Sequence, residues 1–538
     1  MRRLVATVST VALISGGLAL AGAGVATAGV NGSIHGGAAA KYHAKKVTKP
    51  KKTTPPKTGD PTVTNPPCNY TAGPDTTVEY TANRTCSTSS VVNVDGADVT
   101  INLEHHALYG NGTHNNAING TMAPNLTVEN GTISGFADNA INVADNTIGL
   151  TVTGLKLTHV ADGVDAPDSQ LTTVTGNNIT NDKYGIVAPC TVESVFTNNT
   201  VNNISAIGLF LVGGHLGMNQ VTGNTFEGSE EDAVLGWQED DLFTGNTLPS
   251  SGIGAVFLGL DGTSTVTGNT ASDNAVGYLV GASGNNAPSP PDDPLVLSGN
   301  AADYNAIGYL DGTDSIPDLI AGDITTLTEL INGLSGIQFN PTDVHPFVTD
   351  TYSDNIAYGN FIAGFDLTQA ATKVTGNTIT VLQGFLSDSP TGLAGAVGVW
   401  GNSDTFSDIF GNTITGSGLN GAGILTDGSL LDQVYSNTVG LDGVNADGIL
   451  VDPGCANIWI ISNTLNGNGN DGLYILNGLG GLVTVSTNTA NNNGHYGYQL
   501  QSSLLAKDVQ GAGNTGSGDA NGTFDPNAIL AGLNLPGI

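Results

Sequence analysis

The chain has 538 residues, 76 of them Gly, and a formal net charge of −33. All 47 acidic residues lie after position 57, where the only basic residues are Arg84, Lys156, Lys183, Lys373 and Lys507. This composition excludes nucleic acid as a partner, because such binding needs Lys and Arg to neutralise phosphates, and it predicts repulsion of polyuronates unless divalent cations intervene.

Residues 1–28 are predicted to form a secretory signal peptide. A positive start, Met1-Arg2-Arg3, precedes an apolar run, and the small residues Ala26-Thr27-Ala28 supply a cleavage site. The apolar run is too short and too rich in Ala and Gly for a membrane span, and no other segment qualifies. We therefore expect a secreted chain with no transmembrane span after processing; an uncleaved anchor is the alternative.

Residues 29–67 are predicted to form a disordered linker. Its central part reads KYHAKKVTKPKKTTPPK, in which Lys, Pro and Thr leave nothing to form a core. The positive charge would favour contact with an anionic cell wall or membrane surface. A simple spacer role is the alternative.

A repeated phrase dominates the rest of the chain: an apolar residue, two small or polar residues, Asn, one further residue, then an apolar residue. It reads VTGNNI around Asn177, VTGNTF around Asn224 and VTGNTI around Asn377, and undisturbed copies are 22 to 26 residues apart. A second phrase, Gly and a short apolar run, follows each Asn by 8 to 11 residues, as at Gly208 and Gly448. One period cannot bury its apolar residues, whereas stacked periods can, with equivalent Asn side chains forming a ladder. The repeat predicts an all-β, single-stranded parallel β-helix over residues 68–515.

The opening of this region carries a family resemblance. A Cys-containing first strand and the segment Ile101 to Gly110, INLEHHALYG, resemble the N-terminal coils of secreted right-handed β-helix proteins of the pectate-lyase-like superfamily. The resemblance implies a right-handed solenoid but no particular activity, because that superfamily includes lyases, hydrolases, epimerases and non-enzymes. Asp162-Gly163-Val164-Asp165 resembles half of a polygalacturonase-type motif whose other elements are missing, and Asp232 should lie roughly 14 Å from Asp162, too far for a carboxylate pair.

Three insertions, about 285–294, 311–350 and 383–396, interrupt the period. Within the second, Ser315 to about Leu334 has the polar cap, early Pro and apolar spacing of a short helix. Loops that leave neighbouring coils on one side would form the walls of a binding groove. The alternative is that they cover an apolar face. Residues 516–538 are predicted to be a C-terminal cap or tail, and we expect a monomer.

The four cysteines suit an exported chain. Cys68 and Cys86 are close in sequence and are predicted to form a disulfide. Cys190 and Cys455 occupy matching places in repeats that would lie more than ~40 Å apart, so we expect two separate buried thiols.

The predicted catalytic group consists of Asp447, Asp471 and His495. Each Asp precedes the Gly of a second phrase, and one coil on, Tyr496 takes that place with His495 beside it. Two stacked carboxyls ~4.8 Å apart cannot both ionise without a large free-energy cost, so the pKa of one of them rises. One carboxyl can then act as an acid and the other as a base, and a neighbouring His can shuttle protons. The alternative is that each Asp only bonds the backbone of its own turn.

The predicted substrate-binding residues are Asp427, Asp452, Tyr474 and Tyr496. Aromatic residues in or beside the second phrase would stack against sugar rings if they face outward, and packing in the core is their alternative: Phe210, Trp237, Tyr278, Tyr309, Phe365, Trp400 and Tyr474. The acidic surface suits Ca²⁺, but no compact calcium motif is present, so no metal site is assigned.

Two functions follow from these patterns. The first is a secreted β-helix protein that binds or processes a neutral or weakly charged extracellular polysaccharide or cell-wall polymer. The second is a non-enzymatic surface or structural protein that its basic linker holds at the cell envelope. The sequence does not decide whether the chain is an enzyme.

Overall fold

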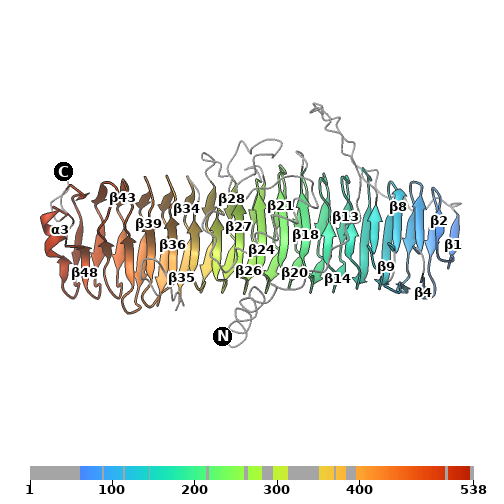
Figure 1. Cartoon of the computed structure of the whole chain (residues 1–538), viewed down its shortest axis with the longest axis horizontal. Helices are drawn as coiled ribbons and strands as arrows, with labels where there is room; N and C mark the ends of the chain where they lie inside the picture. Colours follow the sequence, from blue (N-terminus) through green and yellow to red (C-terminus); the bar gives the residue numbers. More distant parts are fainter. Residues whose placement is uncertain are drawn as a thin grey trace, which may run out of the picture. The chain divides into compact units, whose positions relative to one another are not determined.

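The computed structural model describes residues 61–533, apart from 88–89, 113–114, 144–145, 214–216, 260–263, 282–294, 313–349, 369–370, 383–394, 503 and 505–506. These residues form a right-handed parallel β-helix in a single column of stacked coils (Figure 1). The predicted fold class is therefore confirmed. The predicted signal peptide, most of the predicted linker and the predicted helix from Ser315 lie outside the described residues.

A typical coil has three short strands separated by turns. Each strand pairs in parallel with its equivalent in the next coil, which produces three sheets that run along the column. The first sheet contains β1 (Thr62–Thr64), β3 (Thr77–Glu79), β6 (Thr100–Asn102), β9 (Thr127–Ser134), β11 (Thr151–Thr158), β13 (Thr173–Thr175), β16 (Val195–Thr197), β19 (Gln220–Thr222), β22 (Leu242–Thr244), β25 (Thr265–Thr267), β28 (Val296–Ser298), β31 (Thr351–Ser353), β34 (Lys373–Thr375), β37 (Asp408–Phe410), β40 (Gln433–Tyr435), β43 (Ile458–Ile461), β46 (Val483–Ser486) and β49 (Val509–Gln510).

The second sheet is joined to the first through the long strands β9 and β11, which pair in both. Its other members are β4 (Arg84–Thr85), β7 (Ala107–Tyr109), β14 (Asn178–Thr180), β17 (Thr200–Asn202), β20 (Thr225–Glu227), β23 (Thr247–Pro249), β26 (Thr270–Ser272), β29 (Ala301–Asp303), β32 (Ile356–Tyr358), β35 (Thr378–Val381), β38 (Thr413–Gly416), β41 (Thr438–Leu441), β44 (Thr464–Asn466), β47 (Thr489–Asn491) and β50 (Thr515–Ser517).

The third sheet is built from the Gly-containing phrase. It contains β2 (Tyr70–Ala72), β5 (Val92–Asp95), β8 (Ile118–Met122), β10 (Ile141–Val143), β12 (Asp162–Asp165), β15 (Tyr184–Val187), β18 (Ile207–Val212), β21 (Glu231–Gly236), β24 (Ile253–Leu258), β27 (Val276–Gly281), β30 (Ile307–Asp311), β33 (Ala363–Leu367), β36 (Val397–Asn402), β39 (Ala422–Asp427), β42 (Asp447–Val451), β45 (Leu473–Ile475), β48 (Tyr496–Leu500) and β51 (Gly522–Phe524).

The solenoid begins earlier and ends later than predicted. Strand β1 lies inside the predicted linker 29–67 and pairs with β3, so that prediction is wrong for its last residues. The reason is local: Thr62-Val63-Thr64 has the same sequence as the first-sheet strands β13 and β25. At the other end β51 pairs with β48, beyond the predicted boundary at 515, and the short helix α3 (Pro526–Leu530) follows, with Asp525 as its N-cap.

The Asn residues of the first phrase sit at the turn between the first and second sheets and form the predicted ladder. The side-chain Nδ2 of Asn246 donates to Oδ1 of Asn269 at 3.0 Å and to the carbonyl oxygen of Val221 at 2.9 Å. Its Oδ1 accepts from the backbone N and from Nδ2 of Asn224, both at 3.0 Å. Because every polar atom of the buried amide has a partner, the ladder ties three successive coils together at each step. The ladder runs through Asn177, Asn199, Asn224, Asn246, Asn269, Asn300, Asn355, Asn377, Asn412, Asn437, Asn463, Asn488 and Asn514.

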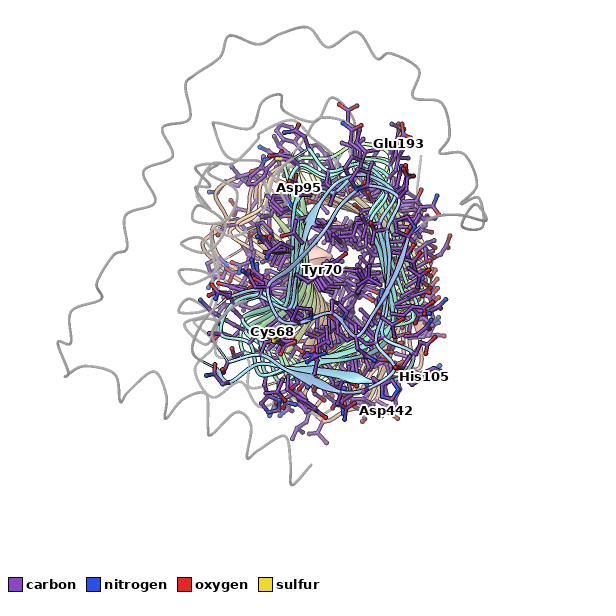
Figure 2. The ribbon with its side chains drawn as sticks, turned by 90° about the vertical axis from the view of Figure 1, so that its right-hand side faces the viewer. Cys68, Tyr70, Asp95, His105, Glu193 and Asp442 are labelled. Carbon is purple, nitrogen blue, oxygen red and sulfur yellow. A yellow bond between two sulfur atoms is a disulfide. The ribbon has the colours of Figure 1, made fainter. Side chains whose placement is uncertain are left out.

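Inward-facing apolar side chains fill the space between the three sheets, and polar residues cover much of the outside. Viewed along the column, Tyr70 points inward, whereas Asp95, Glu193 and Asp442 lie on the outside (Figure 2). Part of the interior is an aromatic stack in which the rings of Tyr278 and Tyr309 are 5.0 Å apart.

The cysteines adopt two kinds of environment. Cys68 and Cys86 form a disulfide with Cα atoms 5.8 Å apart. Cys190 and Cys455 are free, and Cys190 is only half-buried, which corrects the expectation of a fully buried thiol there. Burial raises the pKa of Cys190 to about 12 and that of Cys455 to about 11, so neither is a ready nucleophile. Among the described residues, no helix is long and apolar enough to cross a membrane.

Candidate functional site

The outer face of the third sheet changes character along the solenoid. One residue per coil forms an outward-facing column that is apolar for most of its length and becomes aromatic and polar near the C-terminal end. We call it the outer column. It consists of Val187, Phe210, Val234, Val256, Leu279, Leu310, Asp366, Trp400, Leu425, Leu450, Tyr474 and Gln499.

A parallel column three residues earlier in each strand changes in the same place. It is largely apolar from Ile207 to Ala422, and Asp447 then stacks directly on Ala422. Asp471 follows Asp447 one coil later, and Tyr496 follows Asp471. The predicted catalytic residues therefore lie together, and we call Asp447, Asp471 and His495 the carboxyl–histidine cluster.

Asp447 begins β42 and is 5% exposed. Its Oδ1 accepts from Nδ2 of Asn470 at 2.8 Å and from the backbone N of Asp471 at 3.0 Å. Burial raises the pKa of Asp447 to about 7, and the charge of Asp471 acts in the same direction. Near neutral pH this carboxyl is therefore able to give or take a proton.

Asp471 is 0% exposed, and its Oδ1 contacts Nδ1 of His495 at 3.0 Å and accepts from the backbone N of Tyr496 at 2.7 Å. With the Gln499 amide oriented to satisfy its neighbours, Gln499 donates to Oδ2 of Asp471. Burial raises the pKa of Asp471 to about 6, while the Tyr496 N–H and His495 oppose that rise. The side chain of His495 is 33% exposed, so it carries the contact between this buried carboxyl and solvent.

Two tyrosines frame the cluster. The ring of Tyr496 packs against that of His495, with centroids 4.4 Å apart at 63°. Tyr474 is half-buried in the outer column, and its pKa is raised by burial and by the charges of Asp447 and Asp471. Both predicted substrate-binding tyrosines are thus beside the carboxyl–histidine cluster.

The second predicted acid pair is elsewhere. Asp427 ends β39 and Asp452 follows β42, so this pair lies at the opposite edge of the third sheet from Asp447, ~16 Å away along the strand. Burial raises the pKa of Asp452 to about 7, with a further contribution from Asp427. Burial also raises the pKa of Asp427, which the indole of Trp400 opposes. The four predicted carboxyls are therefore two sites rather than one.

Most of the predicted aromatic platform is buried. Tyr278, Tyr309 and Phe365 belong to the interior core, while Phe210 and Trp237 pack in a second apolar cluster on the third sheet. Only Trp400 and Tyr474 are half-buried. Strand geometry explains the three residues in the core: the first residue after the phrase Gly points inward and the next points outward, as Tyr278 and Leu279 show. Phe210 points outward and is buried within the second apolar cluster.

Sequence reasoning missed two residues that donate hydrogen bonds to the carboxyls of the cluster. Gln499 stacks on Tyr474 in the outer column, and Asn470 precedes Asp471. The column spacing carried the signal for Gln499, since it lies one period after Tyr474. Asp162 and Asp232, as predicted, belong to strands three coils apart, β12 and β21, and do not form a pair. Among the described residues, no group of three His, Cys, Asp or Glu side chains is suited to hold a metal ion.

Comparisons with known proteins bear mainly on architecture. The family model described as periplasmic copper-binding protein (NosD) matches residues 123–288. A DFA-IIIase from Arthrobacter chlorophenolicus A6, solved without its lid in complex with GF2, is 11% identical over 69% of this chain and 84% of that one, with a TM-score of 0.36.

A tailspike protein mutant of E. coli bacteriophage HK620 in complex with a pentasaccharide is 11% identical over 83% of this chain and 73% of that one, with a TM-score of 0.30. A search of curated proteins gave no significant match. Similarities this low support no conclusion about activity. The coil geometry identifies the chain as a right-handed parallel β-helix protein, and the NosD family model matches one segment of it, residues 123–288.

Proposed function

We propose that this chain is an extracellular β-helix protein that binds a neutral polysaccharide at the C-terminal end of its third sheet. The observation that carries the proposal is the replacement of two apolar columns by Asp447, Asp471, Tyr474 and Gln499 at this end. Carboxyls and amides bond sugar hydroxyls, and tyrosine rings pack on the apolar faces of sugars. The strongly acidic solenoid disfavours polyuronates, which leaves neutral glycans as the ligand class.

A second candidate function is turnover of that polysaccharide. The 3.0 Å contact between Asp471 and His495 favours it, because a buried carboxyl that orients a part-exposed imidazole is an arrangement used for general base catalysis. Asp447, with its pKa raised to about 7, is the matching proton donor. The alternative of a non-enzymatic rod at the cell envelope, held by its basic linker, predicts binding without turnover.

The name of the matching family supports a location outside the cytoplasm, in agreement with the predicted secretion signal. It does not lead us to propose a copper site. Copper sites commonly draw on His and Cys ligands, and among the described residues no three His, Cys, Asp or Glu side chains come together to hold a metal ion.

The test is a binding screen with the purified chain against neutral hexasaccharides of glucose, mannose, xylose and fructose, with polygalacturonate as the charged comparison. We expect binding to a neutral member, weakened by at least about tenfold in the Asp447→Asn, Asp471→Asn double variant. The exposed Asp442→Asn serves as the control and should bind normally. Failure of every neutral glycan to bind, or equal binding by the double variant, would refute the proposal.

A further inference from the structure

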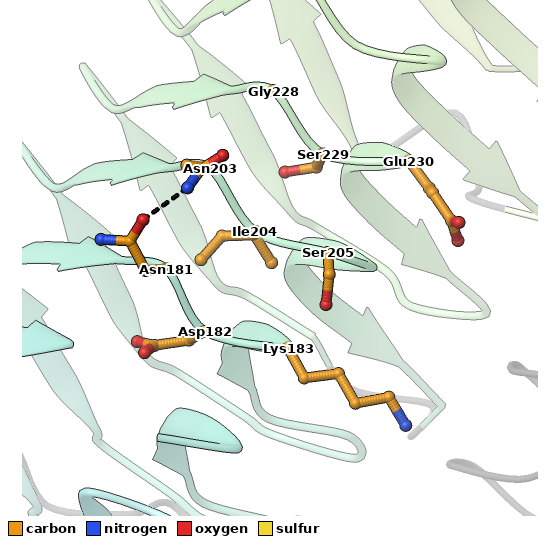
Figure 3. Close-up of a pocket in the computed structure, with 9 residues that line it drawn as sticks. All are labelled: Asn181, Asp182, Lys183, Asn203, Ile204, Ser205, Gly228, Ser229 and Glu230. Carbon is orange, nitrogen blue, oxygen red and sulfur yellow. Dashed lines mark hydrogen bonds between the residues drawn. The ribbon is translucent and has the colours of Figure 1, made fainter. Parts of the chain in front are cut away.

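A cavity of about 620 Å³ lies at the corner where the second sheet passes into the third, over the turns before β15, β18 and β21 (Figure 3). The carboxyl of Asp182 lies beneath it, accepts from the backbone N of Val160 at 2.9 Å and has its second oxygen buried. The two oxygens of this carboxyl are therefore out of reach of a molecule in the cavity. At the C-terminal end of the third sheet, in contrast, a carboxyl, an imidazole and an amide converge on one point.

The point of convergence is one end of the Gln499 amide. This end lies 2.5 Å from Oδ2 of Asp471 and 2.9 Å from Nδ1 of His495. Nδ1 of His495 is also 3.0 Å from Oδ1 of Asp471. All three separations are hydrogen-bond distances, so each contact needs a donor and an acceptor. The amide can supply either at this end, since its NH₂ group donates and its oxygen accepts.

An ionised Asp471 is satisfied by only one orientation of this amide. A carboxylate accepts and cannot donate, so the NH₂ group of Gln499 faces Asp471 and donates to Oδ2. Nδ1–H of His495 donates to Oδ1, which also accepts from the backbone N of Tyr496 at 2.7 Å. The oxygen of the Gln499 amide then faces away from the carboxyl.

A protonated Asp471 is satisfied by the opposite orientation. Oδ2–H donates to the oxygen of Gln499, and the same oxygen accepts from Nδ1–H of His495. The separation of 2.5 Å fits this arrangement better, because O–H···O bonds can be as short as about 2.5 Å whereas N–H···O bonds are about 2.7–3.2 Å long. The NH₂ group of Gln499 then faces away from the carboxyl. A half turn of the amide and one proton separate the two arrangements.

Asp471 changes its protonation state close to neutral pH. It is 0% exposed, and burial raises its pKa to about 6, with a further contribution from the charge of Asp525. The backbone N–H of Tyr496 and the imidazole of His495 oppose that rise in pKa. The other titratable groups that face it are Asp447 of β42 and Tyr474 of β45. The folded chain therefore favours the protonated arrangement below about pH 6 and the ionised one above it.

Gln499 is half-buried in the outer column, so the end of its amide that faces away from Asp471 borders the outer face of the third sheet. We propose that Gln499 determines ligand specificity at this site, and that the proton on Asp471 decides whether its amide offers the ligand an acceptor or a donor. When Asp471 is ionised, the amide oxygen accepts from sugar hydroxyls. When Asp471 is protonated, the NH₂ group donates, and ring and glycosidic oxygens, which only accept, become partners as well. The ligand, a neutral glycan, rests on the proposed function, whereas the turn of the amide is a property of the free chain.

Neutron diffraction from deuterated crystals of the free native chain at about pH 4.5 and about pH 8 shows the orientation of the amide, because it locates deuterons. At the lower pH we expect a deuteron on Oδ2 of Asp471 and the nitrogen of the Gln499 amide turned away from it. At the higher pH we expect no deuteron on Asp471 and the amide nitrogen turned toward it. Asp471→Asn is the matched control: its own amide donates where Oδ2–H would, so Gln499 should keep the acid orientation at both pH values. One orientation at both pH values in the native chain would overturn the proposal.

A pH titration of the chain with ¹⁵N-labelled His tests the role of the ligand in solution. Nδ1 of His495 keeps its proton in both arrangements, so its ¹⁵N signal should stay that of a protonated nitrogen from about pH 4.5 to about pH 8. A hexasaccharide that favours one arrangement about threefold shifts the midpoint of the Asp471–His495 pair by about 0.5 pH unit. We expect a shift of at least this size with each hexasaccharide of glucose, mannose, xylose or fructose that binds.

Two outcomes of this titration would overturn the proposal: an Nδ1 that loses its proton within this range, or an unchanged midpoint with a bound hexasaccharide. Binding by none of the hexasaccharides would refute the proposed function instead, and the neutron result would still decide whether the amide turns with the proton.

Discussion

A buried carboxyl in the outer column makes the stability of the solenoid depend on pH. Asp366 stacks between Leu310 and Trp400 and is 0% exposed. Burial raises its pKa to about 7; the amide of Asn402 opposes the rise and the charge of Asp404 adds to it. Asp366→Leu would replace this carboxyl with the residue type found at Leu310, and we expect the exchange to be stabilising at alkaline pH.

The sign and size follow from proton linkage. The pKa of Asp366 is 3.8 in the unfolded chain, its ordinary value, and about 7 in the folded chain. Between these two pH values the folded chain holds a proton on Asp366 that the unfolded chain has released. The stability that this carboxyl contributes is therefore complete at low pH and is lost as the pH rises through 7. Between about pH 4.5 and about pH 8 the loss amounts to about 3 kcal/mol. Asp366→Leu abolishes that loss, while any packing change it causes is the same at both pH values.

The assay is urea unfolding of the native chain and of Asp366→Leu at both pH values. We expect the variant's advantage in free energy of unfolding to be about 3 kcal/mol larger at the higher pH. Asp442→Leu, at an exposed position, controls for the loss of a charge and should show no such difference. Identical pH dependence in Asp366→Leu and the native chain would refute the reasoning, because it would mean that the carboxyl ionises as freely in the folded chain as in the unfolded one.

Three further outcomes follow from the geometry. Asn246→Asp replaces the Nδ2 donor with an oxygen that faces two acceptors, Oδ1 of Asn269 and the carbonyl oxygen of Val221. We expect this change to lower the free energy of unfolding in urea at about pH 8 by about 2–4 kcal/mol, and the exposed Asn466→Asp to lower it by under about 0.5 kcal/mol. Cys190, whose pKa burial raises to about 12, should react with iodoacetamide at about pH 8 at least about tenfold more slowly in the folded chain than in urea; equal rates would contradict its burial. Any glycan turnover should be greatest between pH values of about 6 and 7, set by Asp471 and Asp447, and should fall at least about a hundredfold in Asp471→Asn; a flat pH profile would exclude the pair.

The architecture could be predicted from the sequence because a solenoid converts spacing along the chain into vertical contact. Asn224, Asn246 and Asn269 are one period apart, and each bonds the next. The same conversion placed Asp447 near Asp471. The spacing did not predict the strand Thr62–Thr64, because a single strand is too short to display a period.

The direction in which each side chain of the second phrase points could also be predicted from the sequence. Within the second phrase, residues alternate between the interior and the outer face, so Tyr309 is buried in the core while Trp400 is on the outside. Treating all aromatic residues near the phrase as equivalent lost this information. The alternation follows from strand geometry alone and needs no structure to apply.

The repeat spacing does not predict which side chains contact each other across one sheet or within one turn. Asp427 and Asp452 resemble Asp447 and Asp471 in sequence, because both pairs repeat at one period, yet the strand length of β42 separates the two pairs across the sheet. The turn geometry that brings His495 back to Asp471 depends on how that turn closes around its own backbone. A repeat therefore determines which coils are neighbours, while the turns determine which chemistry the neighbours share. In this chain the carboxyl–histidine cluster lies at turns and strand ends, and variation in those few residues would alter ligand recognition without disturbing the ladder that holds the coils together.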